Sequence, residues 1–292
     1  MRSRALLLAL VFLLLLPSAA LAQEGGLELE GQVINGTQGG GDVQGLVVAL
    51  QGLLPSGQEV FRLEAITGPG GNFLFSGVVP QEGYLYRPVV EYGKVRYYGD
   101  GFTAQNLRGA FLAMTVYEAT ETDDAIRYLQ QTAVVVEMDQ EAGLLRILED
   151  TVVENAGDRT YIGSRDSAGQ VSTVRVPLPP LAFDVVPGFG FGSQGYLVTE
   201  GTLADIAPLL PGQRDLIYSY SVAYIAPQHA LTRAYPYPTG TVRLLVPTGS
   251  LEVKPLSMTL GEQVEVGDQT YDSFEATGLQ AGEVAGLLLS RL

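Results

Sequence analysis

The residues best suited to contact a ligand in this sequence are tyrosines, because five of them fall within fifteen positions. These tyrosines are interleaved with basic residues in the order Tyr84, Tyr86, Arg87, Tyr92, Lys94, Arg96, Tyr97 and Tyr98. Exposed tyrosines stack on sugar rings or anchor a protein partner, and arginine is favoured beside them. The alternative is a role in the core and in cross-strand pairs, which we favour for Tyr84 and Tyr86.

Two neighbouring tyrosines single out one loop as a contact surface. Successive strand residues point to opposite faces, so Tyr97 and Tyr98 cannot both enter the same core. Gly99 and Gly101 carry no side chains and would let a partner approach the backbone. Basic residues nearby would attract an acidic sugar or a carboxylate-bearing partner. The predicted binding residues are Tyr97, Tyr98, Asp100, Lys94 and Arg96. The alternative is a tight turn whose tyrosines cover the end of a sandwich.

Two further motifs suggest chemistry, but each has a simpler interpretation. Residues 190–195 (GFGSQG) fit the pattern G-x-G-x-x-G, which binds pyrophosphate only where the glycines lead from a strand into a helix. Residues 196–199 have the pattern of a strand, so we expect a flexible loop. His229 is the only histidine, lies in a sequence typical of a turn and is accompanied by no G-x-S-x-G motif. We therefore interpret it as a surface residue rather than a catalytic base.

Acidic residues could supply oxygen ligands or a catalytic pair. Two groups are closely spaced, namely Glu121, Asp123 and Asp124, and Glu137, Asp139 and Glu141. Neither group has the D-x-[DN]-x-[DN]-G calcium loop, so solvated acidic turns are favoured. A carboxylate pair for glycoside hydrolysis stays open, because 32 acidic residues offer many pairs and the sequence selects none.

The composition excludes several other chemistries. The 292 residues include no cysteine and one histidine, which excludes disulfides, thiol nucleophiles, iron–sulfur clusters and multi-histidine metal sites. The 17 basic and 32 acidic residues give a formal charge of −15, which repels nucleic acid and anionic membranes. We expect no cofactor, no metal and no nucleic-acid partner.

The first 22 residues have the three parts of a secretory signal peptide. Arg2 and Arg4 precede an apolar run at 5–16, and small residues at 20 and 22 match the positions that a signal peptidase reads. The run is shorter than the roughly 20 residues that span a bilayer, and no later apolar stretch is long enough. We expect cleavage after Ala22 and a mature chain without a transmembrane segment, either secreted or periplasmic and associated with the cell envelope.

The rest of the chain has the pattern of short strands broken by Gly, Pro, Asn and Asp. Residues 174–178 and 218–224 alternate with period two, which indicates strands with one buried face. Residues 59–75 have the pattern of a strand, a glycine-rich turn and a second strand, which predicts a hairpin. We expect short helices only within 122–129 and 202–210, where a threonine or an aspartate could cap the first turn.

Five segments follow one another in a recognisable order between residues 29 and 98. They are GQVINGT at 31–37, VQGLVVAL at 43–50, TGPGGNFLF at 67–75, GVVP at 77–80 and the strand with Tyr84 and Tyr86. This order resembles the carboxypeptidase regulatory-like domain, a transthyretin-type β-sandwich of secreted bacterial proteins. The resemblance implies a non-catalytic module and brings no catalytic residue. Gly68-Pro69 replaces the aspartate usual in the family, so the turn is expected to differ in shape.

We therefore expect an all-β protein of two successive antiparallel β-sandwiches after the signal peptide. Residues 23–118 would form the carboxypeptidase regulatory-like sandwich and residues 119–292 an immunoglobulin-like one. We interpret the protein as a non-catalytic exported module of the cell envelope or extracellular space, either structural or binding a carbohydrate or a protein partner. The alternative is a secreted, glycosidase-like hydrolase that uses a carboxylate pair.

Overall fold

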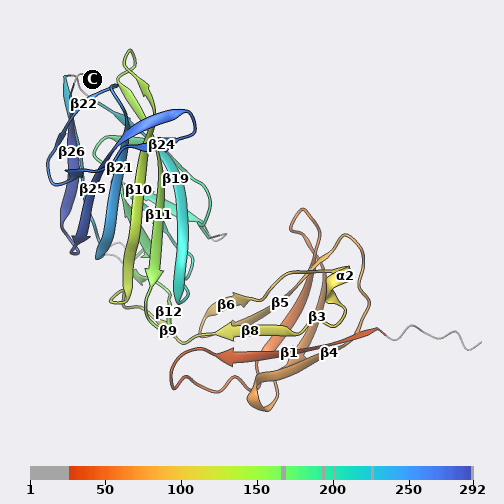
Figure 1. Ribbon diagram of the computed structural model, residues 1–292. Helices are drawn as coiled ribbons and strands as arrows, with labels where there is room; N and C mark the ends of the chain where they lie inside the picture. The colour runs from red at the N-terminus through yellow and green to blue at the C-terminus, as the bar shows by residue number, and fades with distance from the viewer. Residues whose placement is uncertain (1–25, 166–168, 193–194, 200, 225–226, 291–292) are drawn as a thin grey trace, which may run out of the picture.

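The protein is all-β, and its strands form two packed units with separate hydrophobic cores (Figure 1). The computed structural model describes residues 26–165, 169–192, 195–199, 201–224 and 227–290. The predicted signal peptide lies outside the described residues. Within the described part of the chain, no helix is long and apolar enough to cross a membrane.

The first unit is a sandwich of two sheets. Its elements are β1 (Leu27–Asn35), β2 (Val47–Leu53), β3 (Glu59–Ile66), the 3-10 turn η2 (Pro69–Gly71), β4 (Asn72–Val78), β5 (Leu85–Tyr92), β6 (Val95–Tyr98), β7 (Phe102–Thr103), α2 (Ala104–Leu107) and β8 (Leu112–Val116). One sheet has the order β4-β1-β8, and the other has the order β3-β2-β5-β6 with β7 beside β5. Alternate residues such as Val33 and Leu50 are buried between the sheets, as period two predicts.

The predicted hairpin between residues 59 and 75 is wrong. Strand β3 pairs with β2, and β4 pairs with β1 in the opposite sheet. Residues 67–71 therefore carry the chain from one sheet to the other. Gly71 permits this crossing, because its φ is +77° and a Cβ atom there would lie 2.0 Å from the Val33 carbonyl oxygen. Alternation predicts which face of a strand is buried, but it does not identify the neighbouring strand.

The second unit has one large sheet covered by two small sheets. Its strands are β10 (Ile126–Asp139), β11 (Leu144–Asn155), β13 (Ser164–Arg165), β14 (Val171–Ser172), β15 (Val174–Pro177), β16 (Ala182–Pro187), β17 (Tyr196–Thr199), β18 (Thr202–Asp205), β19 (Gly212–Ala223), β20 (Gln228–Ala234), β21 (Thr239–Pro247), β22 (Glu252–Pro255), β23 (Thr259–Leu260), β24 (Val264–Val266), β25 (Gln269–Leu279) and β26 (Val284–Ser290). The large sheet has the order β16-β19-β11-β10-β21-β25-β23, with β24 beside β25. The small sheets are β15-β18-β17 and β20-β26-β22. Leu145, Val176 and Leu287 bring all three sheets into one core.

Most strand pairs are antiparallel, and two long pairs are parallel. Strand β1 runs parallel to β8, and β10 runs parallel to β21. A tight turn cannot join parallel neighbours, so each of these pairs links distant parts of the sequence. The predicted alternation of residues 218–224 is confirmed, because Tyr218, Tyr220 and Val222 all lie in the core.

The two segments predicted to contain short helices are extended instead. Residues 122–129 lead into β10, where Ile126 and Tyr128 are buried and Arg127 is exposed. Residues 202–210 begin with β18, which pairs with β15 and β17. A threonine or aspartate that could cap a helix is equally favoured in turns, and the neighbouring strands supply the backbone hydrogen bonds here.

Two short strands join the units. They are β9 (Ala119–Thr120) and β12 (Thr160–Tyr161), which pair in parallel. Side chains reinforce this junction, because the Thr37 hydroxyl donates to the Asp158 carbonyl oxygen at 2.8 Å. The Tyr97 hydroxyl also lies 2.8 Å from the Thr160 hydroxyl. The division of the chain at residue 118 stays a prediction, and it falls directly before β9.

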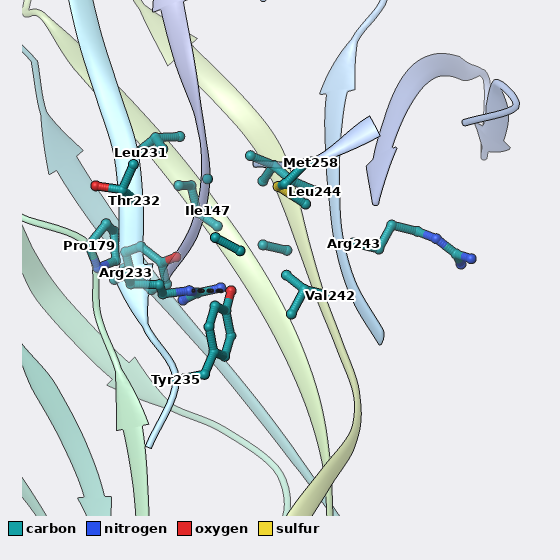
Figure 2. A pocket seen from close by; sticks show the side chains of 14 residues that line it. Ile147, Pro179, Leu231, Thr232, Arg233, Tyr235, Val242, Arg243, Leu244 and Met258 are labelled. Carbon is teal, nitrogen blue, oxygen red and sulfur yellow. Dashed lines mark hydrogen bonds between the residues drawn. The ribbon is translucent and has the colours of Figure 1, made fainter. Parts of the chain in front are cut away.

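A buried ion pair lies between the sheets of the second unit. The Arg233 guanidinium donates to both Glu149 carboxylate oxygens at 2.7 and 2.9 Å, and Glu149 is fully buried. Tyr220 donates to the same carboxylate. Arg233 Nε also donates to the Tyr235 hydroxyl, and these two side chains line a cavity of about 30 Å³ (Figure 2). Burial alone would lower the pKa of Arg233, but the Glu149 carboxylate raises it well above its usual value, so the guanidinium stays charged.

Replacement of Glu149 by alanine should leave a buried guanidinium without its counter-charge. We expect Glu149→Ala to lower the free energy of unfolding by about 3–5 kcal/mol. The matched control is Glu137→Gln, which removes an exposed ion pair with Arg146 at 3.6 Å and should cost less than about 1 kcal/mol. Urea denaturation at neutral pH measures both changes, and equal losses for the two variants would contradict the importance of the buried pair.

Candidate binding site

A two-residue turn carries the first candidate residue. Gly93 and Lys94 connect β5 to β6, and their φ angles are 56° and 69°. Two positive φ angles define the type I′ turn, whose twist matches that of the flanking strands. Glycine adopts this conformation freely, whereas lysine rarely does. Strained residues are enriched at functional sites, so Lys94 is a candidate binding residue.

The alternation of β6 separates its side chains into a structural face and an exposed face. Val95 and Tyr97 point into the first core, and only 3% of Tyr97 is exposed. Arg96 and Tyr98 point outward, and Tyr98 is 50% exposed. The expectation that one of the two tyrosines faces solvent agrees with this arrangement. Tyr97 is removed from the predicted binding residues, because its ring is enclosed by the core.

Arg87 supports the exposed tyrosine ring. The guanidinium carbon of Arg87 lies 4.2 Å from the ring centroid of Tyr98, a cation–π contact. Arg87 also donates to the side-chain oxygen of Gln51 at 3.3 Å. Because the guanidinium covers one face of the ring, this contact restricts the rotation of the Tyr98 side chain.

The exposed face of β6 lines a cleft between the two units. Two adjoining hollows of about 570 and 580 Å³ share Lys94, Arg96 and Pro208, and Tyr98 lines the second hollow. The opposite wall belongs to the second unit and includes Ile162, Arg165, Leu197, Ile206 and Leu210. The cleft thus combines an aromatic ring, aliphatic side chains and basic groups, which is the composition of a small-ligand site.

Positive charge gathers in the cleft of an acidic protein. Lys94 forms no ion pair with any residue that the structure describes. Arg96 donates to Glu91 at 2.5 Å across the hairpin, and both side chains are exposed. Arg165 donates to a backbone carbonyl on its own loop, and Glu121 is the carboxylate on that side of the cleft. Three basic side chains and two carboxylates, Glu91 and Glu121, line the cleft, so in a chain with a formal charge of −15 this surface has a small excess of positive charge, which favours an anionic ligand.

The loop after β6 has a structural explanation that differs from the prediction. Asp100 is exposed, but it does not line either hollow. A Cβ atom at Gly99 would lie 2.7 Å from a Pro88 side-chain atom, and one at Gly101 would lie 3.1 Å from the Leu85 side chain. These glycines therefore permit close packing against β5. Packing alone explains the two glycines, so they do not require a partner that approaches their backbone.

The glycine-rich motif is explained by packing. Strand β17 follows residues 190–195, as expected, so no helix N-terminus faces the glycines. Ser193 and Gln194 lie outside the described residues. Gly190 has a φ of 89°, and a Cβ atom there would lie 1.7 Å from the Asp215 carbonyl oxygen. The motif therefore brings this loop against β19.

The only histidine lies in a strand rather than in the predicted turn. His229 belongs to β20, where it is opposite Leu289. Its side chain is partly buried, and burial lowers its pKa, so the imidazole is neutral at pH 7. The strand forms here because residues 228–234 pair with β26, an interaction between distant segments that local turn signals do not reveal.

Three residues of the two acidic groups have separate partners. Asp123 pairs with Arg175 at 2.9 Å, Glu137 pairs with Arg146, and Asp139 accepts the backbone N–H of Ala142. Within the described ranges, no cluster of three or more histidine, aspartate or glutamate side chains could hold a metal ion.

Tyr92 is a further tyrosine with a structural role. Its hydroxyl donates to the Glu118 carboxylate at 2.5 Å, and this hydrogen bond raises the pKa of Tyr92 to about 12. The same bond lowers the pKa of Glu118, which also accepts the backbone N–H of Gly41. Tyr86 lies in the core, as predicted, where its hydroxyl accepts the backbone N–H of Gln81. The hydroxyls of both tyrosines are therefore engaged within the first unit.

Comparison with known proteins assigns no family to the chain. No family model matches it, and no curated protein matches it. An M1 zinc metallopeptidase from Deinococcus radiodurans gives a TM-score of 0.36 at 15% identity, covering 59% of this chain and 44% of the peptidase chain. The aligned part thus spans less than half of that peptidase. The major pilin SpaD from Corynebacterium diphtheriae gives a TM-score of 0.22 at 12% identity, covering 91% of this chain and 81% of the pilin.

The two neighbouring tyrosines should respond differently to truncation. We expect Tyr97→Ala to cost about 3–5 kcal/mol of unfolding free energy, because it empties a filled core position and removes a hydroxyl that contacts Thr160. Tyr98→Ala loses an exposed ring and one cation–π contact and should cost less than about 1 kcal/mol. Thermal and urea denaturation of both variants measure this difference. A large loss for Tyr98→Ala would show that its ring is part of the core.

Relief of the strained turn should stabilise the protein. Lys94→Gly places the residue that prefers positive φ at the second turn position, and we expect a gain of about 0.5–1 kcal/mol in unfolding free energy. Lys94→Ala keeps the strain and loses the ammonium group, so it is the matched variant and should not be stabilised. Chemical denaturation compares the two, and a loss of stability in Lys94→Gly would contradict the strain.

Proposed function

We propose that this protein is a non-catalytic exported module that binds a carboxylate-bearing saccharide in the cleft between its two sandwiches. The observation that carries the proposal is the strained Lys94, which lies beside Arg96 and the half-exposed Tyr98 at that cleft. A secreted or envelope location follows from the predicted signal peptide. The β-sandwich of the first unit supports its assignment as a carboxypeptidase regulatory-like domain.

The cleft offers complementary groups for such a ligand. The ring of Tyr98 provides a flat apolar surface for the C–H face of a sugar, and its other side rests on Arg87. The Lys94 ammonium and the Arg96 guanidinium donate hydrogen bonds to a carboxylate, and charged hydrogen bonds of this kind are the stronger ones. Arg165 on the opposite wall can contact a second acidic unit of the same chain.

The arrangement of carboxylates favours binding over hydrolysis. A glycosidase uses two carboxyl groups, one of which must act as a proton donor. Glu91 is held in an ion pair with Arg96, and Glu121 lines the other hollow. Lys94 and Arg96 line both hollows, so each carboxylate shares its hollow with basic side chains. The proposal therefore treats the protein as a binding module rather than an enzyme.

A glycan array tests the ligand class directly. We expect oligosaccharides that contain uronic or sialic acids to bind and neutral oligosaccharides of equal length to bind far more weakly, with affinity falling as salt increases. Tyr98→Ala and Lys94→Ala should each weaken binding by at least about 1 kcal/mol, roughly fivefold. Lys254→Ala, which removes the other lysine of the chain, and Tyr196→Ala, which removes another exposed tyrosine, are the matched controls.

Two results would contradict the proposal. The first is equal binding of neutral and acidic glycans, or acidic binding that persists in the folded Tyr98 and Lys94 variants. The second is release of new reducing ends from a bound oligosaccharide, which would identify a hydrolase. Replacement of Glu91 and Glu121 by glutamine would then show which carboxylates act.

A further inference from the structure

Strand β3 is an open edge of the first sandwich. It is the first strand in the order β3-β2-β5-β6, so only its β2 side is paired among the described residues. An open edge presents unpaired backbone donors and acceptors and can pair with another strand. The strand has eight residues, long enough for a regular ladder.

The hydrogen-bond pattern identifies which residues face the open edge. Thr67, directly after β3, donates its backbone N–H to the Leu46 carbonyl oxygen at 2.9 Å. Hydrogen-bonded positions alternate along an antiparallel strand, so Phe61, Leu63 and Ala65 direct their backbone groups to β2. A register shift opposite Gly52 and Leu53 interrupts this alternation before Phe61. In the regular part of the strand, the even-numbered residues Arg62, Glu64 and Ile66 therefore direct their N–H and C=O groups outward.

The sequence of this edge is complementary to itself. An antiparallel copy with its two-fold axis at Leu63 places Arg62 opposite Glu64 of the second copy, and Val60 opposite Ile66. The outward-directed backbone groups of Arg62 and Glu64 then lie opposite each other and can form the central hydrogen bonds of a ladder. Opposite charges and apolar pairs directly across a ladder are each favourable.

Neighbouring registers lack this complementarity. With the axis at Arg62, two guanidinium groups face each other, and with the axis at Glu64, two carboxylates do so. Like charges directly opposite destabilise a strand pair. In the single chain, Arg62 contacts Glu64 at 3.0 Å and Glu59 at 3.4 Å, and all three side chains are solvent-accessible. These exposed contacts are worth little and can be exchanged for contacts across the interface.

Apolar groups at this edge also lack cover. Val60 is 41% exposed and Ile66 is 68% exposed, although both are strand residues. On the inner face, Phe61, Leu63 and Ala65 are only partly buried against the first core. We propose that β3 pairs with β3 of a second copy of this chain, in the register centred on Leu63, to form one continuous sheet. The cleft lies along β6 at the other edge of that sheet and stays open.

Charge reversal tests both the dimer and its register. We expect the purified protein to sediment as a dimer in analytical ultracentrifugation. Arg62→Glu places carboxylates opposite each other and should lower the association constant at least about tenfold, and Glu64→Arg should do the same with two cations. Combining both substitutions in one chain restores opposite charges and should restore the dimer. Mixing the two single variants should produce a heterodimer, because their edges are complementary.

Cysteine cross-linking provides a second measurement in a chain without native cysteines. Leu63→Cys lies on the two-fold axis at a pair without direct hydrogen bonds, where Cβ atoms are about 4.5–5.5 Å apart, so mild oxidation should link two chains. Ala65→Cys is the control, because its counterpart lies four residues away along the partner strand. A monomeric native protein, or linkage through position 65 but not 63, would overturn the proposal.

Discussion

The cleft depends on the hydrogen bonds that hold the two sandwiches against each other. Strand β6 contributes to both structures, because alternate residues of the same four-residue strand point in opposite directions. Tyr97 extends inward to Thr160 at the junction, whereas Arg96 and Tyr98 extend outward into the cleft. The Thr37–Asp158 contact and the β9–β12 pair limit rotation at the same junction. A ligand held between the units would therefore meet a largely preformed site, which lowers the entropic cost of binding.

The sequence predicts the properties of single strands better than their partners. Period two gives the all-β class and the exposure of one tyrosine of the pair Tyr97 and Tyr98. It does not show that β4 crosses to the opposite sheet, because the partner is chosen by packing across the whole domain. The basic side of the cleft was predictable from Lys94 and Arg96. Its opposite wall was not, because no local pattern brings Arg165 or Pro208 to a strand more than sixty residues earlier.

Charge is distributed unevenly between the interior and the surface. Glu149 and Arg233 are buried as a hydrogen-bonded pair, where they add little net stability but tolerate few alternative packings of the sheets around them. Lys94, in contrast to this buried pair, lies in a strained and exposed turn without an ionic partner among the described residues. The buried Glu149–Arg233 pair is explained by the packing of the sheets of the second unit. The strained turn costs stability, and under the proposed function that cost is accepted because Lys94 contributes to binding.

The parallel pairing of β10 with β21 has a consequence for how the chain acquires its structure. Tyr128 and Thr239 are neighbours in the sheet although about 110 residues separate them. The centre of the large sheet therefore cannot close until nearly the whole chain has emerged, whereas the first sandwich contains all of its own strands by residue 116. A chain that emerges from its N-terminus to its C-terminus would therefore fold the first unit early. The second unit would fold later and more slowly. In that interval the strands β10 and β11 can pair with each other but lack their outer neighbours β21 and β19, so their exposed edges and apolar faces would be prone to misassociation.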